Sequence, residues 1–446
     1  MIYYGLYPFV VVIMMRVGFY TLGCKTNQFE TQALERLFAA RGHTVVDFRS
    51  EADVYIVNTC TVTALGDKKS RAAARQAKKR NPNATLIVCG CYAQVSPDAV
   101  RELCGADIVV GSSGKGQIVE LAEQAQAGHV LQPDLPPALA KKPFECLPAG
   151  GLLGRTRALL KVQDGCQNFC TYCLIPFARG PSRSMPFDDA VRECARLERE
   201  GYREIVVTGI EISSYGLDLS PARSLAQLAP ALCAAAPETR IRLGSLEPRT
   251  VTEEFCLALS CHRNLCPHFH LSLQSGCDTT LRAMGRRYDT ERFALSCELL
   301  RRYFPGCAIT TDLITGFPGE SEQDFAQTLD FLRRIAFAQV HIFPYSRRKG
   351  TRAFSMPGQI PRAEREARAH AAAQVCAQTR MQFLQSRVGQ TAEVLFEQRE
   401  NGLFFGHDMQ YCPVRMPGEH LSGQVRLVRI AAAGPDGLSA EPLQSC

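Results

Sequence analysis

The sequence predicts an α/β protein that ends in a small all-β domain. Apolar strands alternate with amphipathic helices over residues 16–121 and again over residues 158–382, which is the pattern of parallel sheets covered by helices. From residue 388 onward, short strands separated by turn residues replace that pattern, as is typical of a small β-barrel. Residues 125–155 are rich in Pro and Gly and are expected to form a linker.

Each α/β stretch has a definite set of expected elements. The first should hold helices over residues 27–41 and 67–80 and three strands, VGFYTL, ADVYIVNTC and ATLIVCGC. The second should hold helices such as 186–200 and 321–334 and six strands, ALLKVQ, EIVVTGI, RIRLGSL, HFHLSLQ, AITTDLITG and AQVHIFPYS. Six βα units indicate a full or partial barrel, whose site would lie at the carboxyl ends of the strands. A long helix, ARAHAAAQVCAQTRMQFLQSRV, then leads to the strands TAEVLFE, LFFGHD and GQVRLVRI of the small β-barrel.

Composition indicates the compartment and the kind of chemistry. The 446 residues include 51 Lys and Arg against 44 Asp and Glu, and the net charge of +7 permits a polyanionic partner without showing one. Twenty Cys in a chain of this length do not fit a small disulfide-stapled secreted domain. Because no secretory signal is recognisable, we expect a cytoplasmic protein with reduced thiols and no membrane association. Metal binding is then the leading use of clustered cysteines.

The first fourteen residues, MIYYGLYPFVVVIM, are apolar but too short to span a bilayer. They lack the basic start and the small-residue cleavage site of a signal peptide. Because the strand-like run MRVGFYTLG begins at Met15, we expect translation to start at Met15 rather than at Met1. A peripheral membrane anchor is the alternative.

A cysteine triplet follows the first strand of the second stretch. Cys166, Cys170 and Cys173 form a C-x3-C-x2-C array in DGCQNFCTYCLIPFARGPSRS. Three thiolates on a short loop can bind three irons of a [4Fe–4S] cluster, which leaves the fourth iron for S-adenosylmethionine (SAM). The alternatives are three unrelated core cysteines or a zinc knuckle, although no fourth zinc ligand follows at a similar spacing. The triplet therefore predicts a SAM-binding cluster that generates a 5′-deoxyadenosyl radical.

Three further cysteines end the three strands of the first stretch. Cys24 lies in LGCKTNQFE, Cys60 in VNTCTVT and Cys91 in VCGCYAQ. Parallel strands end along a common edge, so these thiols can converge on one crevice and hold a second cluster with an open iron. Single cysteines at strand ends are also often merely buried. The pattern leaves both interpretations open and does not separate Cys89 from Cys91.

The segments LGCKTNQFE, DVYIVNTCTVT and GCYAQ resemble the amino-terminal cluster motifs of the methylthiotransferase family, and the resemblance extends over essentially the whole chain from Met15. It selects Cys24, Cys60 and Cys91 as ligands of an auxiliary [4Fe–4S] cluster. It also implies four segments: an N-terminal methylthiotransferase domain (15–127), a linker (128–151), a radical SAM core with a partial (βα)6 barrel (152–382), and a TRAM-like RNA-binding β-barrel (383–446).

Within the family, GCKTNQFET, VNTCTVT and GCQNFCTYCLIPFARGPSRS are most similar to the branch that acts on N6-threonylcarbamoyladenosine in tRNA. The isopentenyladenosine branch typically has Gln-Met-Asn after the first Cys, and the branch that modifies an Asp of a ribosomal protein has Pro-Lys-Asn. A single-cluster radical enzyme and a non-catalytic RNA-binding module with structural zinc are the alternatives from other classes.

The resemblance implies methylthiolation of carbon 2 of the adenosine at position 37, in the anticodon loop. The radical would abstract hydrogen from that carbon, the auxiliary cluster would supply sulfur, and a second SAM would supply the methyl group. An electron donor such as flavodoxin or ferredoxin is the further partner, and the sulfur source that replenishes the cluster is unknown.

Six residues of the second stretch are candidates for contacts with SAM. A glycine allows close backbone approach and a carboxylate suits the ammonium group, while polar strand ends and an aromatic side chain suit ribose and adenine. Ordinary turn, capping and core roles are the alternatives. The candidates are Gly209, Glu211, Ser245, Gln274, Asp312 and Phe343.

Two basic segments and three aromatic residues are candidates for RNA contacts. The basic residues are Lys68, Lys69, Arg71, Arg75, Lys78, Lys79 and Arg80 in one helix, and Arg347, Arg348, Lys349 and Arg352 after the last barrel strand. They can neutralise phosphates or form solvated surfaces. In the C-terminal barrel, Phe404, Phe405 and Tyr411 can stack on bases or form the core.

Overall fold

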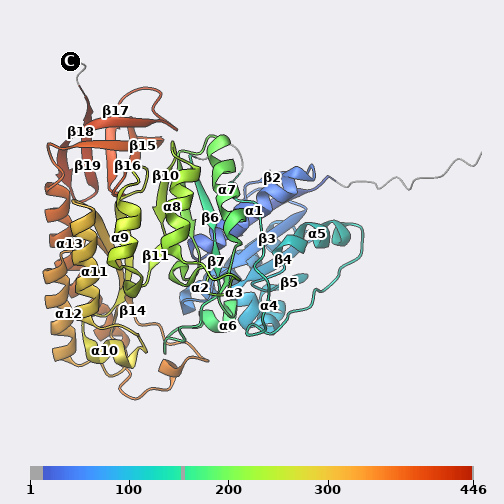
Figure 1. Ribbon diagram of the computed structural model, residues 1–446. Coiled ribbons are helices and arrows are strands. Elements are labelled where there is room, and N and C mark those ends of the chain that lie inside the picture. Colours follow the sequence, from blue (N-terminus) through green and yellow to red (C-terminus); the bar gives the residue numbers. More distant parts are fainter. Residues whose placement is uncertain (1–13, 152–155, 444–446) are drawn as a thin grey trace, which may run out of the picture. The chain divides into compact units, whose positions relative to one another are not determined.

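The computed structural model describes residues 14–151 and 156–443, which divide into two units (Figure 1). The first unit lies within residues 1–61 and 65–137, and the second within residues 62–64 and 138–446. The choice between Met1 and Met15 as the start, and the expected domain boundaries at residues 152 and 446, involve positions outside the described residues.

The first unit is built on a five-stranded parallel sheet with the order β2-β1-β3-β4-β5. The strands are β1 (Arg16–Thr21), β2 (Thr44–Val46), β3 (Val54–Thr59), β4 (Thr85–Gly90) and β5 (Ile108–Val110). The three predicted strands are β1, β3 and β4. β2 and β5 were not predicted, because a strand of three residues is too short to show an alternating pattern.

Helices cover both faces of this sheet. They are α1 (Lys25–Ala40), α2 (Ala64–Arg80), α3 (Cys91–Val95), α4 (Pro97–Cys104) and α5 (Ile118–Gln126). Side chains of α1 and α5 pack on one face, and side chains of α2 and α4 pack on the other. Every residue of β3 and β4 is therefore buried, which explains their continuous apolar runs. Polar chemistry in this unit is confined to the strand ends.

Part of the expected linker packs onto the first unit. Gln132 accepts a hydrogen bond from the backbone N–H of Val109 at 3.3 Å, and Gln94 donates to the carbonyl oxygen of Pro136 at 3.1 Å. The first unit accordingly extends to Pro137, ten residues beyond the expected end of the N-terminal domain.

The second unit contains the predicted six parallel strands. They form two sheets, β10-β9-β6 and β11-β12-β13-β14. Gly244 separates β10 from β11, which together correspond to the one predicted strand RIRLGSL. The strands are β6 (Arg157–Lys161), β9 (Glu204–Thr208), β10 (Arg240–Leu243), β11 (Ser245–Leu246), β12 (His268–Gln274), β13 (Ala308–Thr315) and β14 (Gln339–Pro344).

Helices connect these strands in βα order, which confirms the predicted barrel-type α/β fold. They are α6 (Ile175–Arg179), α7 (Phe187–Arg199), α8 (Leu225–Ala235), α9 (Glu253–Ser260), α10 (Asp278–Ala283), α11 (Thr290–Tyr303) and α12 (Glu322–Ile335). A short antiparallel pair, β7 (Gln163–Asp164) with β8 (Arg183–Ser184), closes the loop that carries the cysteine triplet.

Helix α13 (Arg362–Gln385) leads into a closed C-terminal barrel, drawn in red in Figure 1. Its strand order is β15-β16-β17-β19-β18, with β15 (Thr391–Glu400), β16 (Leu403–Asp408), β17 (Pro413–Pro417), β18 (Val425–Gly434) and β19 (Gly437–Pro442). The predicted small β-barrel is thus confirmed, although β17 and β19 were not foreseen. Phe404 lies in the core of this barrel, so its ring is not available to stack on RNA.

The C-terminal barrel is attached at the amino ends of β9 and β10. Arg242 forms two hydrogen bonds with the buried carboxylate of Glu204, at 2.8 and 2.9 Å, and donates to the carbonyl oxygen of Met409 at 2.9 Å. The Tyr411 ring stacks on His407 with centroids 4.5 Å apart, and the Arg242 guanidinium lies 4.8 Å from the Tyr411 ring. Tyr411 therefore belongs to this attachment, and the cysteine triplet lies at the opposite, carboxyl ends of the strands.

Within residues 14–151 and 156–443, none of the helices has the length and apolar character needed to cross a bilayer.

Candidate active site

The cysteine triplet lies on the loop between β7 and α6. The backbone N–H of Cys166 donates to Gly180 O at 3.0 Å, and the N–H of Cys173 donates to Cys170 O at 2.9 Å. The N–H of Ile175 points at the Cys173 sulfur at 3.4 Å. Backbone donors of this kind stabilise sulfur in its thiolate form, which is the form that binds metal.

A second set of contacts fixes the middle of the loop. Thr171 donates its backbone N–H to Met284 O and its hydroxyl to Ala283 O, both at 2.9 Å. The N–H of Ala353 donates to Thr171 O at 2.8 Å. Segments after α10 and after β14 thus hold the loop from both sides, although more than 100 residues separate them from it in sequence.

Asp164 stabilises the cysteine loop through ion pairs and a hydrogen bond. Its Oδ2 lies 3.3 Å from Lys161 Nζ, 3.4 Å from Arg179 Nη1 and 2.9 Å from Arg183 Nη2. Its Oδ1 accepts the backbone N–H of Gly165 at 2.8 Å. All four of these charged side chains, Lys161, Asp164, Arg179 and Arg183, are buried. Buried cationic side chains suit a neighbouring group that carries several thiolates.

Cys166 and Cys173 lie close enough to Cys170 for a charge on its sulfur to affect their ionisation. Burial raises the pKa of Cys166 to about 11 and that of Cys173 to about 12, and negative charge on Cys170 opposes the ionisation of both. Metal binding would reverse this balance, because a coordinating thiol is deprotonated outright.

In the described part of the chain, no three Cys, His, Asp or Glu side chains gather closely enough to hold a single metal ion. A [4Fe–4S] cluster makes a different demand, because each thiolate binds its own iron. Three neighbouring thiols fit that demand, because they lie on one loop that is held by hydrogen bonds and is next to buried basic side chains.

Four of the predicted SAM contacts lie on one face of the sheet β11-β12-β13-β14. Ser245 and Asp312 are partly or fully exposed, and each is next to a buried leucine that points to the opposite face of its strand. Phe343 is exposed and pairs with Ile314, which puts it on the same face as Asp312. Gln274 ends β12 with a φ of 71°, which is uncommon for a residue other than glycine, at an irregularity in the pairing with β13. This polar face points toward the inside of the partial barrel.

Two histidines on the same face were missed from the sequence. His270 Nε2 lies 3.3 Å from Asp312 Oδ2, and its Nδ1 lies 3.0 Å from Thr310 Oγ1. The His341 ring lies 6.0 Å from the His270 ring between centroids. The alternation in HFHLSLQ, where polar residues occupy every second position, could have indicated His270.

Gly209 and Glu211 follow β9 and lie beside Gln163. A Cβ at Gly209 would come within 2.9 Å of Gln163, so glycine permits this close approach. Gln163 accepts the backbone N–H of Glu211 at 2.8 Å, and the Glu211 carboxylate accepts the N–H of Ser213 at 3.0 Å. Burial raises the pKa of Glu211, and its negative charge in turn raises the pKa of Cys166. Glu211 therefore lies near the triplet.

In the first unit, Cys24, Cys60 and Cys91 each come just after one of three adjacent strands, β1, β3 and β4. A Cβ at Gly23, which precedes Cys24, would lie 3.2 Å from the Cys60 sulfur. A Cβ at Gly90, which precedes Cys91, would lie 2.7 Å from the carbonyl oxygen of Thr59. Both glycines have positive φ, and their packing brings the three cysteine-bearing loops to one edge of the sheet.

Asn27 joins two of these loops. Its side-chain amide donates to Leu22 O at 2.7 Å and to Thr59 O at 2.9 Å, while its oxygen lies 3.9 Å from the Cys24 sulfur. Cys89, in contrast, lies within β4 and is completely buried in the core that faces α1 and α5. Of the two cysteines that the sequence did not separate, Cys91 is the one at the strand end.

Comparison with known proteins identifies the two units. The radical SAM superfamily matches residues 160–332, and the uncharacterized protein family UPF0004 matches residues 16–111. A threonylcarbamoyladenosine tRNA methylthiotransferase, MtaB, from Bacillus subtilis (strain 168) is 36% identical over 427 residues, which cover 94% of this chain and 95% of that protein. This chain belongs to the radical SAM tRNA methylthiotransferase family. SAM and a [4Fe–4S] cluster are therefore cofactors of the enzyme.

Other relatives and solved structures agree with this assignment. The MtaB of Thermotoga maritima is 34% identical over 95% of this methylthiotransferase and 96% of its own length. A tRNA-2-methylthio-N(6)-dimethylallyladenosine synthase of Mycobacterium bovis is 35% identical over 93% of this chain and 81% of its own. The radical SAM methyltransferase TsrM from Kitasatospora setae has a TM-score of 0.56 at 15% identity, over 77% of each chain, which shows the shared fold.

The methylthiotransferase presents basic side chains on α2, directly after Cys60. Three of them have partners within the protein: Arg71 donates to the Tyr92 hydroxyl, Lys78 pairs with Asp107, and Arg80 donates to the carbonyl oxygen of Phe48. The exposed members of the predicted basic helix are Lys68, Lys69, Arg75 and Lys79. After β14, the exposed basic residues are Arg347, Lys349 and Arg352, while Arg348 is buried.

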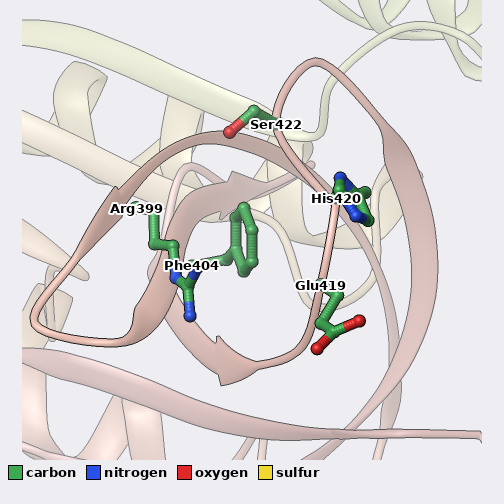
Figure 2. Close-up of a pocket in the computed structure, with 5 residues that line it drawn as sticks. All are labelled: Arg399, Phe404, Glu419, His420 and Ser422. Atoms are coloured by element: carbon green, nitrogen blue, oxygen red, sulfur yellow. The ribbon is translucent and has the colours of Figure 1, made fainter.

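The C-terminal barrel of the methylthiotransferase carries a cavity of about 580 Å³ that no cysteine of either triplet lines (Figure 2). It is lined by Arg399, Phe404, Glu419, His420 and Ser422. The Arg399 guanidinium lies 5.6 Å from the Phe404 ring. The cavity combines a cation, an imidazole and a hydroxyl with one acidic group.

Proposed function

We propose that this enzyme attaches a methylthio group to carbon 2 of N6-threonylcarbamoyladenosine at position 37 of tRNA, with sulfur from an auxiliary [4Fe–4S] cluster. The observation that carries the proposal is the presence of two separate cysteine triplets, each at the carboxyl ends of parallel strands. Radical generation needs only one such site. A second site with the same thiol content gives the sulfur-transfer step a place of its own.

The cofactors supply the difficult chemistry: one cluster, when bound, supplies the electron that cleaves SAM to a 5′-deoxyadenosyl radical, and the other supplies sulfur. The protein supplies ligands, orientation and exclusion of water. Cys166, Cys170 and Cys173 would hold the first cluster. Cys24, Cys60 and Cys91 would hold the second.

Residues around the first triplet have roles that follow from their chemistry. Glu211 has a carboxylate beside the triplet, suited to the ammonium group of SAM. Phe343 has an exposed ring, suited to stacking on adenine. Ser245, Gln274 and Asp312 offer hydrogen-bonding groups to ribose and methionine from the same sheet face, and Gly209 lets the Glu211 turn approach Gln163.

The choice of substrate rests on two observations. The motif GCKTNQFET has Lys-Thr-Asn after the first Cys, unlike the Gln-Met-Asn of the isopentenyladenosine branch. The MtaB proteins of Bacillus subtilis and Thermotoga maritima match nearly end to end, whereas the mycobacterial synthase matches over 81% of its length. Because the identities are nearly equal, the motif carries more weight than the percentages.

RNA binding is assigned to exposed basic groups in both units. The four exposed cations of α2 lie just after Cys60, where a phosphate backbone would lie when its base approaches the sulfur site. The target adenosine is in a single-stranded loop, where a base can leave its stack at low cost. The cavity of Figure 2 offers Arg399 and His420 to further phosphates.

The same proposal includes the segment limits 15–127, 128–151, 152–382 and 383–446, a flavodoxin- or ferredoxin-type electron donor, and action in the cytoplasm, where thiols stay reduced.

Mass spectrometry of tRNA nucleosides from cells with and without this gene tests the substrate. Loss of 2-methylthio-N6-threonylcarbamoyladenosine on deletion is the expected result. If that nucleoside persisted while 2-methylthio-N6-isopentenyladenosine disappeared, the sister substrate would be correct.

Iron counting tests the second cluster. Anaerobically purified protein should contain about eight irons per chain, against about four for a single-cluster enzyme. Replacement of Cys24, Cys60 or Cys91 by Ala should stop thiolation while SAM cleavage continues. Thiolation that survived these replacements would exclude the proposed sulfur site.

A further inference from the structure

Arg286 contacts the cysteine triplet from outside its loop. Its Nη1 lies 3.3 Å from the sulfur of Cys170, within hydrogen-bonding distance. The two residues are 116 positions apart in sequence, and Arg286 belongs to none of the motifs discussed above. An arginine keeps its charge at any physiological pH, so a permanent positive charge lies against one of the three sulfurs.

Other contacts fix the orientation of Arg286. Its Nε donates to the hydroxyl of Tyr288 at 3.0 Å, and its guanidinium lies 4.8 Å from the Tyr288 ring. Tyr288 is buried, and its hydroxyl donates to Leu273 O at 2.8 Å. Arg286 is therefore joined to β12 through Tyr288 and does not sample solvent as a surface arginine does.

The backbone next to Arg286 is also fixed against the cysteine loop. Met284 accepts the N–H of Thr171, which lies beside Cys170 in sequence. Gly285 has a φ of 74°, and a Cβ there would lie 3.6 Å from the Thr171 methyl group. The turn that carries Arg286 is thus attached to the same loop that the guanidinium contacts.

We propose that Arg286 is a positioning residue that raises the reduction potential of the radical-generating cluster by donating a hydrogen bond to Cys170. This inference rests on the proposed function, which assigns Cys170 as a ligand of that cluster. Reduction adds one electron, from the external donor, to a cluster whose ligands are already anionic. A cation and an N–H donor at a ligand sulfur stabilise the added negative charge.

Arg286 can act in two ways: it can hold the cysteine loop in place, and it can set the reduction potential of the cluster. If Arg286 only braces the loop, its removal lowers cluster content and leaves the potential of the remaining clusters unchanged. If it also sets the potential, clusters that do assemble become harder to reduce. Reduction potential, measured per bound cluster, distinguishes these roles.

The experiment uses full-length protein in which Cys24, Cys60 and Cys91 are replaced by Ala, so that only the radical-generating cluster remains. Redox titration followed by electron paramagnetic resonance is carried out on this protein and on Arg286→Gln and Arg286→Lys versions of it. Arg287→Gln is the matched control, because Arg287 is the next residue and its side chain is exposed.

The expected result is a shift of the midpoint potential to more negative values in Arg286→Gln. The shift should be smaller in Arg286→Lys, which keeps the charge but not the planar fork, and absent in Arg287→Gln. Formation of 5′-deoxyadenosine by Arg286→Gln should fall with a weak reductant and recover with titanium(III) citrate. A structural defect would not recover in this way.

An unchanged potential in Arg286→Gln, at normal iron content, would overturn the inference and leave the proposed function intact. Failure of the triple-Ala parent protein to bind about four irons would instead contradict the ligand assignment on which both depend. If Arg286→Gln binds no cluster, the measurement is made on Arg286→Lys. A wild-type midpoint potential in Arg286→Lys, together with wild-type formation of 5′-deoxyadenosine with the weak reductant, would overturn the inference.

Discussion

Asp164 is a buried carboxylate that contacts three buried cations next to the cysteine loop. The side chains of Lys161, Arg179 and Arg183 all approach its Oδ2 within 3.4 Å. A buried charge that loses its partner is strongly destabilising, because the remaining charge pays its desolvation cost without compensation. Asp164 therefore affects the stability of the loop more than its distance from any reacting atom indicates.

Replacement of Asp164 by Asn should lower the free energy of unfolding by about 3–5 kcal/mol, because three buried cations lose an ionic partner that they share. Urea unfolding of the apoprotein measures this. The control is Asp98→Asn, which breaks the exposed 3.0 Å pair with Arg101 and should cost less than about 1 kcal/mol. Equal effects of the two substitutions would mean that the buried group contributes no more than a surface pair.

Asn27 has a comparable role in the first unit, where it donates to both Leu22 O and Thr59 O. Replacement by Ala leaves the two carbonyl groups without this donor and releases the Cys24 loop from the end of β3. Total iron should fall from about eight toward about four per chain, while 5′-deoxyadenosine formation continues. Gln28→Ala, at the exposed neighbouring position, should keep its iron. Loss of iron from both variants alike would argue against a specific role for Asn27.

At the residue scale, the sequence predicted groups of residues that are close together in the chain better than contacts between residues that are far apart in it. Cys166, Cys170 and Cys173 lie within eight positions, so the sequence alone indicates their shared role. Arg286 and Cys170 meet only because the segment after α10 packs against the cysteine loop, and no local sequence pattern indicates this contact. His270 is an intermediate case: the alternation of polar residues in β12 was visible in the sequence, but the contact of His270 with Asp312 was not predicted.

At the scale of elements, continuous apolar runs predicted strands that are buried on both faces of a sheet. β3 and β4 are examples, because every residue in them is buried. β17 begins and ends with Pro and has a single β-branched residue, Val414, while β19 reads GLSAEP and has no β-branched or aromatic residue. Both therefore lack the composition typical of strands. These two segments become strands because they pair with β16 and β18, and with each other, to close the C-terminal barrel.

The attachment of the C-terminal barrel depends on Glu204, at the amino end of β9. Burial acts to raise the pKa of Glu204, but Arg242, Arg157 and Arg240 outweigh it and lower the pKa to about 2. Its ordinary value is 4.5. The ionised carboxylate therefore stabilises the fold above pH 4.5, and this contribution is lost as the pH falls toward 2. The difference corresponds to about 3 kcal/mol.

Glu204→Gln tests this contribution. The variant should be less stable than wild type by about 3 kcal/mol or more near neutral pH, and the difference should shrink as the pH falls through the range below 4.5. Apoprotein unfolding at a series of pH values measures it. Glu393→Gln removes a half-exposed partner of Arg240 at the same attachment and should show a small effect at every pH. A Glu204→Gln deficit that did not change with pH would contradict the lowered pKa.

At the scale of the whole molecule, charge placement matters more than net charge. A net charge of +7 spread over 446 residues is modest, yet four exposed cations gather on α2 next to one cysteine triplet. The cations of the Asp164 group are buried and unavailable to RNA. Composition therefore permitted a polyanionic partner without locating it, and the distribution of exposed charge is what indicates the contact.

Replacement of Lys68, Lys69, Arg75 and Lys79 by Gln should weaken tRNA binding and lower its salt dependence. Each lost phosphate contact lowers the magnitude of the slope of log K against log salt concentration by about 0.7–0.9, so loss of all four contacts lowers it by about 2.8–3.6. Filter binding of tRNA at several salt concentrations measures the slope. A matched control replaces four exposed arginines on other helices, Arg302, Arg333, Arg334 and Arg362, and changes the net charge equally. If both quadruple variants lost the same slope, the effect would reflect overall charge and not a contact at α2.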